Sequence, residues 1–356
     1  MQNYKKSLIA FSIIPQILLL KVLANYPAFV ESVYSHGLYI YISRGMRYVF
    51  GWLPVSVGDL LYTLLGLYVI RWLIINRKRI TKDTKHWCLD VLSAISIGYF
   101  AFHMLWAFNY YRLPLHESLN IDKDYTTEEL ITLTDQIILK VNDIHLSITE
   151  NDSVKVEMPF SKSELLKMIP DGYDQLSKTF PYLEYHPRSI KKSIYSLPLT
   201  YMGFSGYLNP FTNEAQVDGL IPSYKFPTTG SHEVAHQLGY AAENEANFIG
   251  SMAAMNHPNI YFQYSGHAFA LRHCLNEIYR RDPDMYETFF LKLNKGVLKN
   301  YQEVRDFWDG YENITEPLFK ETYNNFLKAN NQSDGMESYS YVVALLVNYH
   351  KSHPLE

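Results

Sequence analysis

The chain has 356 residues, with 32 Lys and Arg against 36 Asp and Glu, and a net charge of -4. This length is typical of about two domains, and the lack of a basic excess argues against nucleic acid as a partner. Only Cys88 and Cys274 occur, so neither a disulfide framework nor a cysteine metal site is expected.

Three apolar stretches come first, at about residues 7–28, 57–75 and 87–108. Each is close to the roughly 20 residues that cross a bilayer, and Trp and Tyr near their ends fit a membrane interface. The alternatives are a signal peptide for the first stretch and buried helices of a soluble core for all three. We interpret residues 1–112 as a transmembrane region with three spans, with an amphipathic helix in the 31–56 link.

Positive charges predict the orientation of the spans. The short link between spans two and three carries five basic residues, Arg77, Lys78, Arg79, Lys82 and Lys85. Basic links stay in the cytoplasm. We therefore expect a multi-pass protein of the cell membrane, in contact with the lipid bilayer, whose residues 113–356 form an extracytoplasmic domain.

The domain after residue 112 is predicted to be α+β and mostly helical, with a small β-sheet. Ser or Thr followed three residues later by Glu begins helices over 126–143 and 161–170, as in a capping box. Another helix is expected over 174–185, and strands over 190–197 and twice within 203–220. The remaining predicted helices are 242–255, 262–280, 285–298, 301–308 and 339–349.

The sequence His232-Glu233-Val234-Ala235-His236 contains the His-Glu-x-x-His pattern. On a helix, His232 and His236 leave one face a turn apart and can share a zinc ion, while Glu233 can act as general base toward a water. The alternative is two packed histidines. Gly239 follows as a helix stop, because glycine readily adopts the left-handed conformation.

Downstream, Glu243 and Asn247 complete a spacing that resembles the gluzincin branch of the zincin metallopeptidases. The resemblance implies that Glu243 is the third zinc ligand and that Asn247 orients a ligand histidine. The usual Asp at that position is Asn here. Glu245 is the competing carboxylate, but the two glutamates point about 200° apart on a helix, so only one can face the metal.

The same resemblance implies a zincin-like metallopeptidase domain in which an edge strand before the active helix pairs with an extended peptide or protein substrate. Residues 214–221 are the candidate, with an ordinary hairpin as the alternative. A His or Tyr is also expected to stabilise the oxyanion. His267, Tyr264, Tyr339 and Tyr341 are the candidates, and the sequence does not choose among them.

The full chain is similar to the bacterial membrane proteins called domain of unknown function 3810. Three segments carry the similarity beside His232–Gly239: Asn109–Pro114, Asn209–Ala215 and Glu243–Phe248. The resemblance implies a membrane-anchored zinc metallopeptidase that hydrolyses peptide bonds. The alternatives are a membrane-tethered zinc sensor or scaffold without hydrolase activity, and a zinc amidase acting on cell-wall peptides.

Overall fold

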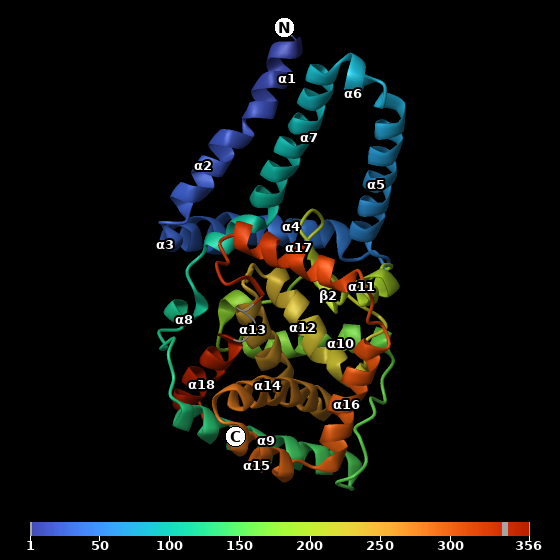
Figure 1. Cartoon of the computed structure of the whole chain (residues 1–356). Coiled ribbons are helices and arrows are strands. Elements are labelled where there is room, and N and C mark those ends of the chain that lie inside the picture. The colour runs from blue at the N-terminus through green and yellow to red at the C-terminus, as the bar shows by residue number, and fades with distance from the viewer. Residues whose placement is uncertain (1, 337–340, 356) are drawn as a thin grey trace.

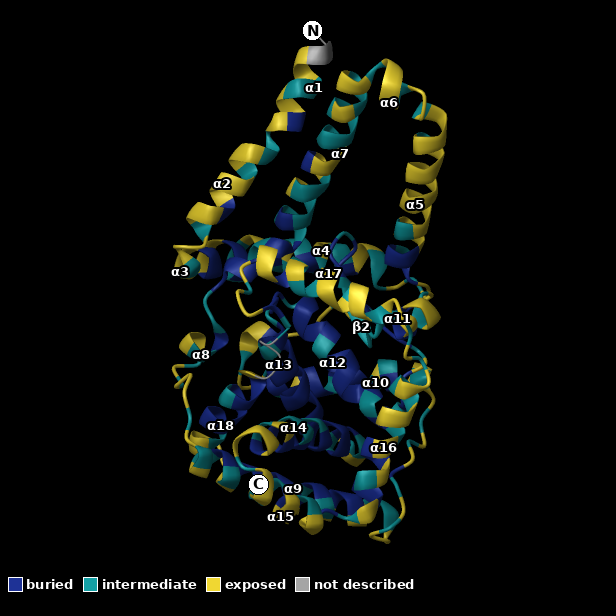
Figure 2. Cartoon of the chain, in the orientation of Figure 1, coloured by how far each residue is buried: buried dark blue, intermediate teal, exposed yellow. Residues whose placement is uncertain are grey.

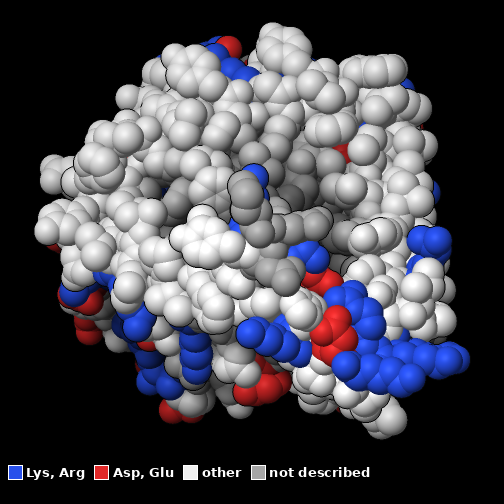
Figure 3. Space-filling view, turned by 90° about the horizontal axis from the view of Figure 1, so that it is seen from above, with Lys and Arg blue, Asp and Glu red and all other residues white. Residues whose placement is uncertain are grey.

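The computed structural model describes residues 2–336 and 341–355. Three long helical arms leave one side of a globular domain (Figure 1). Their surfaces are mostly exposed, whereas the interior of the domain is buried (Figure 2). Seen along the arms from above, Lys and Arg gather toward one side of the view and uncharged atoms cover most of the rest (Figure 3).

Three helical segments are long and apolar enough to cross a membrane: Tyr4–Leu23, Val57–Asn76 and Thr84–Leu105. The first comprises α1 (Gln2–Phe11) and α2 (Ile13–Leu23), the second is α5 (Val57–Asn76) and the third is α7 (Thr84–Leu105). The first ends at Leu23, before the predicted residue 28, and Pro27 begins a separate short helix. The third ends before 108 because Trp106 leaves the helical conformation.

The link between the first two spans is helical, as expected. It contains α3 (Pro27–Phe29), the π-helix η1 (Val30–Leu38) and α4 (Tyr39–Phe50). One face of α4 buries Ser43 and Arg47, and the opposite face exposes Tyr41 and Tyr48. The helix is thus amphipathic, and it crosses the base of the arms (Figure 1).

Both predicted capping boxes are present. They begin α9 (Thr127–Thr149) and α10 (Lys162–Leu176). The predicted end of α10 near Pro170 was wrong, and so was a helix over 174–185. Packing keeps α10 helical beyond the proline, because the Tyr173 hydroxyl donates to the Ser231 carbonyl at 2.5 Å. The chain then turns, and only the short 3-10 helix η3 (Pro181–Leu183) follows.

The sheet has three strands in the order β1-β3-β2. Strand β1 (Ile190–Lys192) is parallel to β3 (Glu214–Val217), and β2 (Gly206–Asn209) is antiparallel to it. The predicted first strand is shorter than 190–197, because α11 (Ser196–Met202) replaces its end. The prediction that 214–221 forms an edge strand was wrong: β3 is central, and β2 is the antiparallel edge.

The remaining residues form helices around the sheet. The predicted 285–298 helix is divided between two helices, and the helix Glu316–Ala329 was not predicted. The long helices that follow the sheet in the chain are α12 (Phe226–Gln237), α13 (Glu243–Met255), α14 (Ile260–Arg281), α15 (Pro283–Lys292), α16 (Lys295–Asp309), α17 (Glu316–Ala329) and α18 (Val342–Ser352). Short helices complete the fold: α6 (Arg79–Lys82), η2 (Ala107–Tyr111), α8 (Leu115–Ser118) and η4 (Ser223–Lys225).

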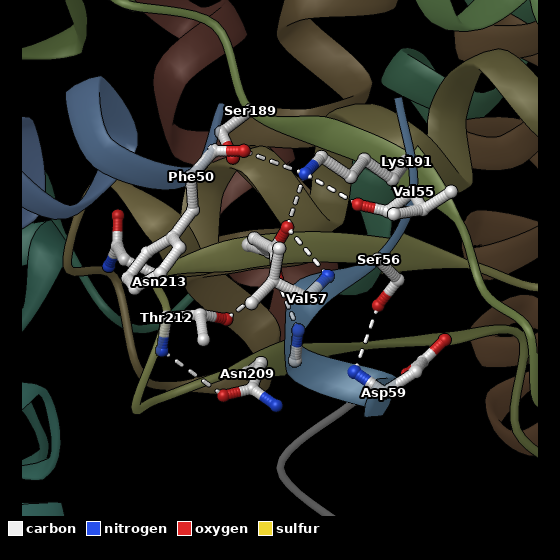
Figure 4. Close-up of polar contacts among 12 residues, drawn as sticks. Phe50, Val55, Ser56, Val57, Asp59, Ser189, Lys191, Asn209, Thr212 and Asn213 are labelled. Carbon is white, nitrogen blue, oxygen red and sulfur yellow. Dashed lines mark hydrogen bonds and ion pairs between the residues drawn. The ribbon is translucent and has the colours of Figure 1, made fainter. Parts of the chain in front are cut away.

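A buried ion pair joins the base of α5 to the sheet (Figure 4). The Glu214 carboxylate is bound by the Lys191 ammonium and accepts hydrogen bonds from the backbone N–H groups of Val57 (3.2 Å) and Gly58 (2.5 Å). These N–H groups have no partners within α5 because they belong to its first turn. Glu214 therefore satisfies the start of α5 and the Lys191 charge together.

We predict that Glu214→Gln lowers the free energy of unfolding by about 3–5 kcal/mol, because it leaves a buried ammonium without its counter-ion. Chemical denaturation of the detergent-solubilised chain measures the change. The matched control is Glu184→Gln. It breaks the ion pair between Glu184 and Arg44, in which the Glu184 side chain is 58% exposed. The free energy of unfolding should fall by less than about 1 kcal/mol, because exposed ion pairs contribute little. Equal losses in the two variants would contradict this role of Glu214.

Candidate metal centre

The His-Glu-x-x-His residues lie at the end of α12, which stops in a defined turn. The Gly239 N–H donates to the His236 carbonyl at 3.0 Å, and the Tyr240 N–H donates to the Ala235 carbonyl at 3.1 Å. This is the hydrogen-bond pattern of a Schellman motif. Gly239 has φ +95°, so the predicted left-handed glycine is confirmed. The turn sends the chain back along α12 as α13.

The reversal places three donor groups together. The Glu243 Oε2 lies 3.3 Å from the His232 Nε2 and 3.5 Å from the His236 Nε2. The two imidazole rings are 4.5 Å apart between centroids and nearly perpendicular, at 88°. Among the residues that the structure describes, these three are the group that could hold a metal ion, with donor atoms within 4.8 Å of one another.

The spacing of these atoms fits zinc. Zinc binds His nitrogen and carboxylate oxygen at about 2.0–2.2 Å, so two ligand atoms of a tetrahedral site are about 3.3–3.6 Å apart. Both distances from Glu243 Oε2 fall in this range. That buried oxygen makes no hydrogen bond of good geometry, and such an atom is costly without a partner. A zinc ion bound by the three residues would be the partner of this oxygen. Its fourth coordination position would stay open for water.

Close packing between α12 and α13 holds Glu243 in place. A Cβ added at Gly250 of α13 would come within 2.7 Å of the His232 backbone nitrogen, so only glycine permits this approach. Burial raises the pKa of Glu243, but the two imidazoles more than offset it and hold the pKa well below its usual range. The carboxyl group is therefore ionised, as a metal ligand must be.

Two of the three candidate ligands have a hydrogen-bond partner that orients them. The His236 Nδ1 lies 2.7 Å from the Tyr240 carbonyl, which directs Nε2 toward the cluster. The Tyr323 hydroxyl of α17 donates to Glu243 Oε1. Burial lowers the pKa of His232, and Asn247 beside it opposes part of this shift. The His232 Nδ1 and the Asn247 Nδ2 make no hydrogen bond of good geometry.

Tyr323 was not identified from the sequence. It is 80 residues beyond Glu243 and belongs to no motif. The only available signal was the helical spacing of Phe319, Tyr323 and Phe326, which would have predicted α17 but not its partner.

Glu233 lies next to the edge strand. A Cβ added at Gly206 of β2 would come within 2.6 Å of the Glu233 Oε1, so the strand passes directly over this carboxylate. Burial raises the pKa of Glu233 to about 8; His236 opposes the shift and Glu243 adds to it. A divalent cation at the neighbouring ligands would favour the ionised form, because opposite charge lowers a carboxyl pKa.

Glu245 is held away from the three donor atoms. Its Oε1 accepts a hydrogen bond from the Leu115 backbone N–H at 2.7 Å. Burial raises its pKa to about 7, and Arg112 and the Leu115 N–H oppose the shift. Glu245 thus interacts with residues just after the third span, and the geometry favours Glu243 as the third ligand.

Of the four oxyanion candidates, Tyr264 and His267 have hydrogen-bond partners outside the cluster. The Tyr264 hydroxyl donates to the Asn300 Oδ1 at 2.8 Å. The His267 Nδ1 contacts the Gln263 carbonyl at 2.8 Å. Burial lowers the pKa of His267 to about 4, and Lys140 and His350 add to the shift. Tyr341 lies on the wall of a cavity of about 630 Å³ that Glu245 also lines. Tyr339 lies outside the described residues.

Side chains from the N-terminal third bind the backbone at the end of α12. The Trp106 indole N–H donates to the His236 carbonyl at 2.9 Å, and the Tyr39 hydroxyl donates to the Gln237 carbonyl at 2.9 Å. The Arg112 Nη1 donates to the Gly239 carbonyl at 2.9 Å. The carbonyls of a helix end need such partners when they are buried, and here the segments next to the spans provide them.

These features define a mostly helical protein with three candidate membrane spans and a possible metal centre. The chain belongs to the family described as protein of unknown function, DUF3810, whose family model matches residues 34–347. The match begins within η1 and includes the second and third spans and the whole candidate metal centre. No curated protein and no solved structure matches the chain.

We predict that Glu243→Gln weakens zinc binding sharply, because an amide is a poorer ligand than a carboxylate, whereas Glu245→Gln keeps the affinity. Titration of purified full-length protein with zinc and a competing chelator measures both. Glu245→Gln is the matched control, since it changes the same side chain two residues away. Loss of zinc in Glu245→Gln alone would overturn the assignment of Glu243.

Proposed function

We propose that this protein is a membrane-anchored zinc metallopeptidase of the gluzincin type. The observation that carries the proposal is the spacing of Glu243 Oε2, at 3.3 and 3.5 Å from the two imidazoles, with a second buried carboxylate, Glu233, beside them. His232, His236 and Glu243 would hold the zinc. The further carboxylate supports catalysis, because a purely structural zinc site needs no general base.

When bound, the zinc would lower the pKa of a water and polarise a peptide carbonyl. Glu233 accepts the proton of the attacking water and then delivers it to the leaving amine, as general base and general acid in turn. Tyr323 and the Tyr240 carbonyl keep Glu243 and His236 oriented during these steps. The chain thus supplies the proton transfer and the positioning that hydrolysis of an amide requires.

The edge strand β2 supports a peptide as substrate. An extended peptide can add to a strand edge through main-chain hydrogen bonds, and Gly206 brings the β2 backbone close to Glu233. A peptide bound in this way would pass the proposed zinc in an extended conformation. Cell-wall peptides, the substrates of a zinc amidase, satisfy the same chemistry and remain the second enzymatic candidate.

We predict that Glu233→Gln abolishes hydrolysis of a quenched-fluorescence peptide library and leaves zinc content unchanged, because the amide cannot accept the proton. Purified wild-type protein and the variant are compared for cleavage and for zinc by elemental analysis. If the wild type binds zinc and cleaves neither this library nor cell-wall peptides, the protein is better described as a zinc sensor or scaffold. Activity retained in Glu233→Gln would contradict the proposed base.

We further propose that the metal centre lies on the extracytoplasmic side of the cell membrane, because the Arg77–Lys85 link is basic and such links stay in the cytoplasm. A reporter enzyme that is active only in the cytoplasm, fused after Glu356, should give no signal. The same reporter inserted within Arg77–Lys85 is the matched control and should be active. The reverse pair of results would invert the topology.

A further inference from the structure

The globular domain packs beside the first two turns of α5, and not only below them. Tyr62 of α5 stacks on Tyr207 of β2, with ring centroids 6.3 Å apart, and meets the Phe211 ring edge-on at 6.3 Å. The Tyr195 hydroxyl contacts the Thr63 hydroxyl and donates to the Asp59 carbonyl at 3.1 Å. The connection from β1 to α11 and the β2–β3 hairpin therefore lie alongside α5 as far as Thr63.

The length of α5 determines where a bilayer must begin. Its 20 residues cover about 30 Å, which is the thickness of the hydrocarbon core. The hydrocarbon core cannot extend beyond Asn76, because the basic residues of the Arg77–Lys85 link would then be buried in it. The 13 residues from Leu64 to Asn76 would cover only about 20 Å. The first two turns of α5, with the loops beside them, must therefore lie at the bilayer surface.

These neighbouring segments expose a group of apolar side chains. Ile194 lies in the connection before α11, and Leu197 and Tyr201 lie in α11; they are 57%, 51% and 47% exposed. Ile314 lies two residues before α17 and Leu318 in its first turn, and they are 97% and 66% exposed. We call these five residues the α11–α17 patch.

The two parts of the patch are adjacent. The Asn313 side chain donates to the Tyr201 carbonyl at 2.7 Å, and the Tyr201 and Tyr311 rings are 5.3 Å apart. Figure 1 shows α11 and α17 on the side of the domain from which the arms leave. An exposed apolar patch of this kind marks an interaction surface.

We propose that the α11–α17 patch docks on the lipid bilayer and lies in its headgroup layer. Continuity with α5 identifies the occupant as lipid, because Tyr195, one residue after Ile194, already contacts a residue of that helix. Tyr41 and Tyr48 of α4 and Trp52 just after it are exposed, and α4 crosses the base of the arms (Figure 1). Such aromatic side chains favour the membrane interface. The proposal depends on α5 crossing a bilayer and not on hydrolysis.

Single-cysteine labelling of the full-length chain tests this proposal. Cys88→Ser removes the exposed cysteine, and the buried Cys274 stays. An environment-sensitive fluorophore is placed at Leu197→Cys and, separately, at Leu318→Cys. The matched control is Leu291→Cys on α15, which is 83% exposed and lies at the far end of the domain (Figure 1). Leu67→Cys, in the middle of α5, reports on insertion.

The protein is placed in nanodiscs of phosphatidylethanolamine and phosphatidylglycerol. A headgroup nitroxide lipid should quench the labels at 197 and 318 several-fold more than the label at 291, and aqueous iodide should show the opposite order. If an acyl-chain nitroxide quenches the label at 67 while 197 and 318 behave like 291, the patch does not touch lipid. Protection of 197 and 318 from both quenchers would also overturn the proposal and indicate a protein partner.

Discussion

The candidate metal centre depends on one turn, at Gly239. The left-handed conformation of this residue ends α12 and returns the chain, so that the first residue of α13, Glu243, faces the two histidines of the preceding helix. A Cβ at this position would also lie 2.9 Å from the Tyr39 ring. Glycine is therefore required twice, by backbone conformation and by space. Without the reversal, the carboxylate and the imidazoles would lie at opposite ends of an extended segment.

Because Tyr39, Trp106 and Arg112 bind the carbonyls of this turn, the N-terminal third is part of the support of the centre. Arg112 is itself held by Glu31, with two hydrogen bonds at 2.8 and 2.5 Å. Removing one member of such a buried ion pair strongly destabilises the fold, because the other charge is left without a partner. The boundary drawn at residue 112 thus separates segments of sequence that pack together, and the segments next to the candidate spans help to position the centre.

The site could be predicted from the sequence where local periodicity decides the geometry. Four-residue spacing on a helix places His232 and His236 together, and a glycine after the helix predicts the reversal. Both capping boxes were found because capping is a local interaction between residues three apart. The edge strand was misassigned because strand order depends on pairing between distant segments, and local sequence patterns do not determine that pairing.

Tertiary contacts explain the other failures. α10 continues beyond Pro170 because the Tyr173 side chain is buried against α12, and that burial outweighs the helix-breaking tendency of proline. Tyr323 reaches Glu243 only because α17 passes beside the turn between α11 and β2, where the Tyr323 and Phe204 rings are 5.3 Å apart. Neither the Tyr173 contact with α12 nor the Tyr323 contact with Glu243 can be predicted from residue spacing along the chain.

The most direct test of the metal centre is X-ray absorption at the zinc edge on the purified, zinc-loaded chain. His232, His236 and Glu243 predict a first shell of two nitrogen and two oxygen neighbours at about 2.0–2.2 Å, one oxygen from Glu243 and one from water at the open position. The spectrum should also show the outer-shell scattering of two imidazoles. Sulfur at about 2.3 Å, or a shell without imidazole scattering, would contradict the account.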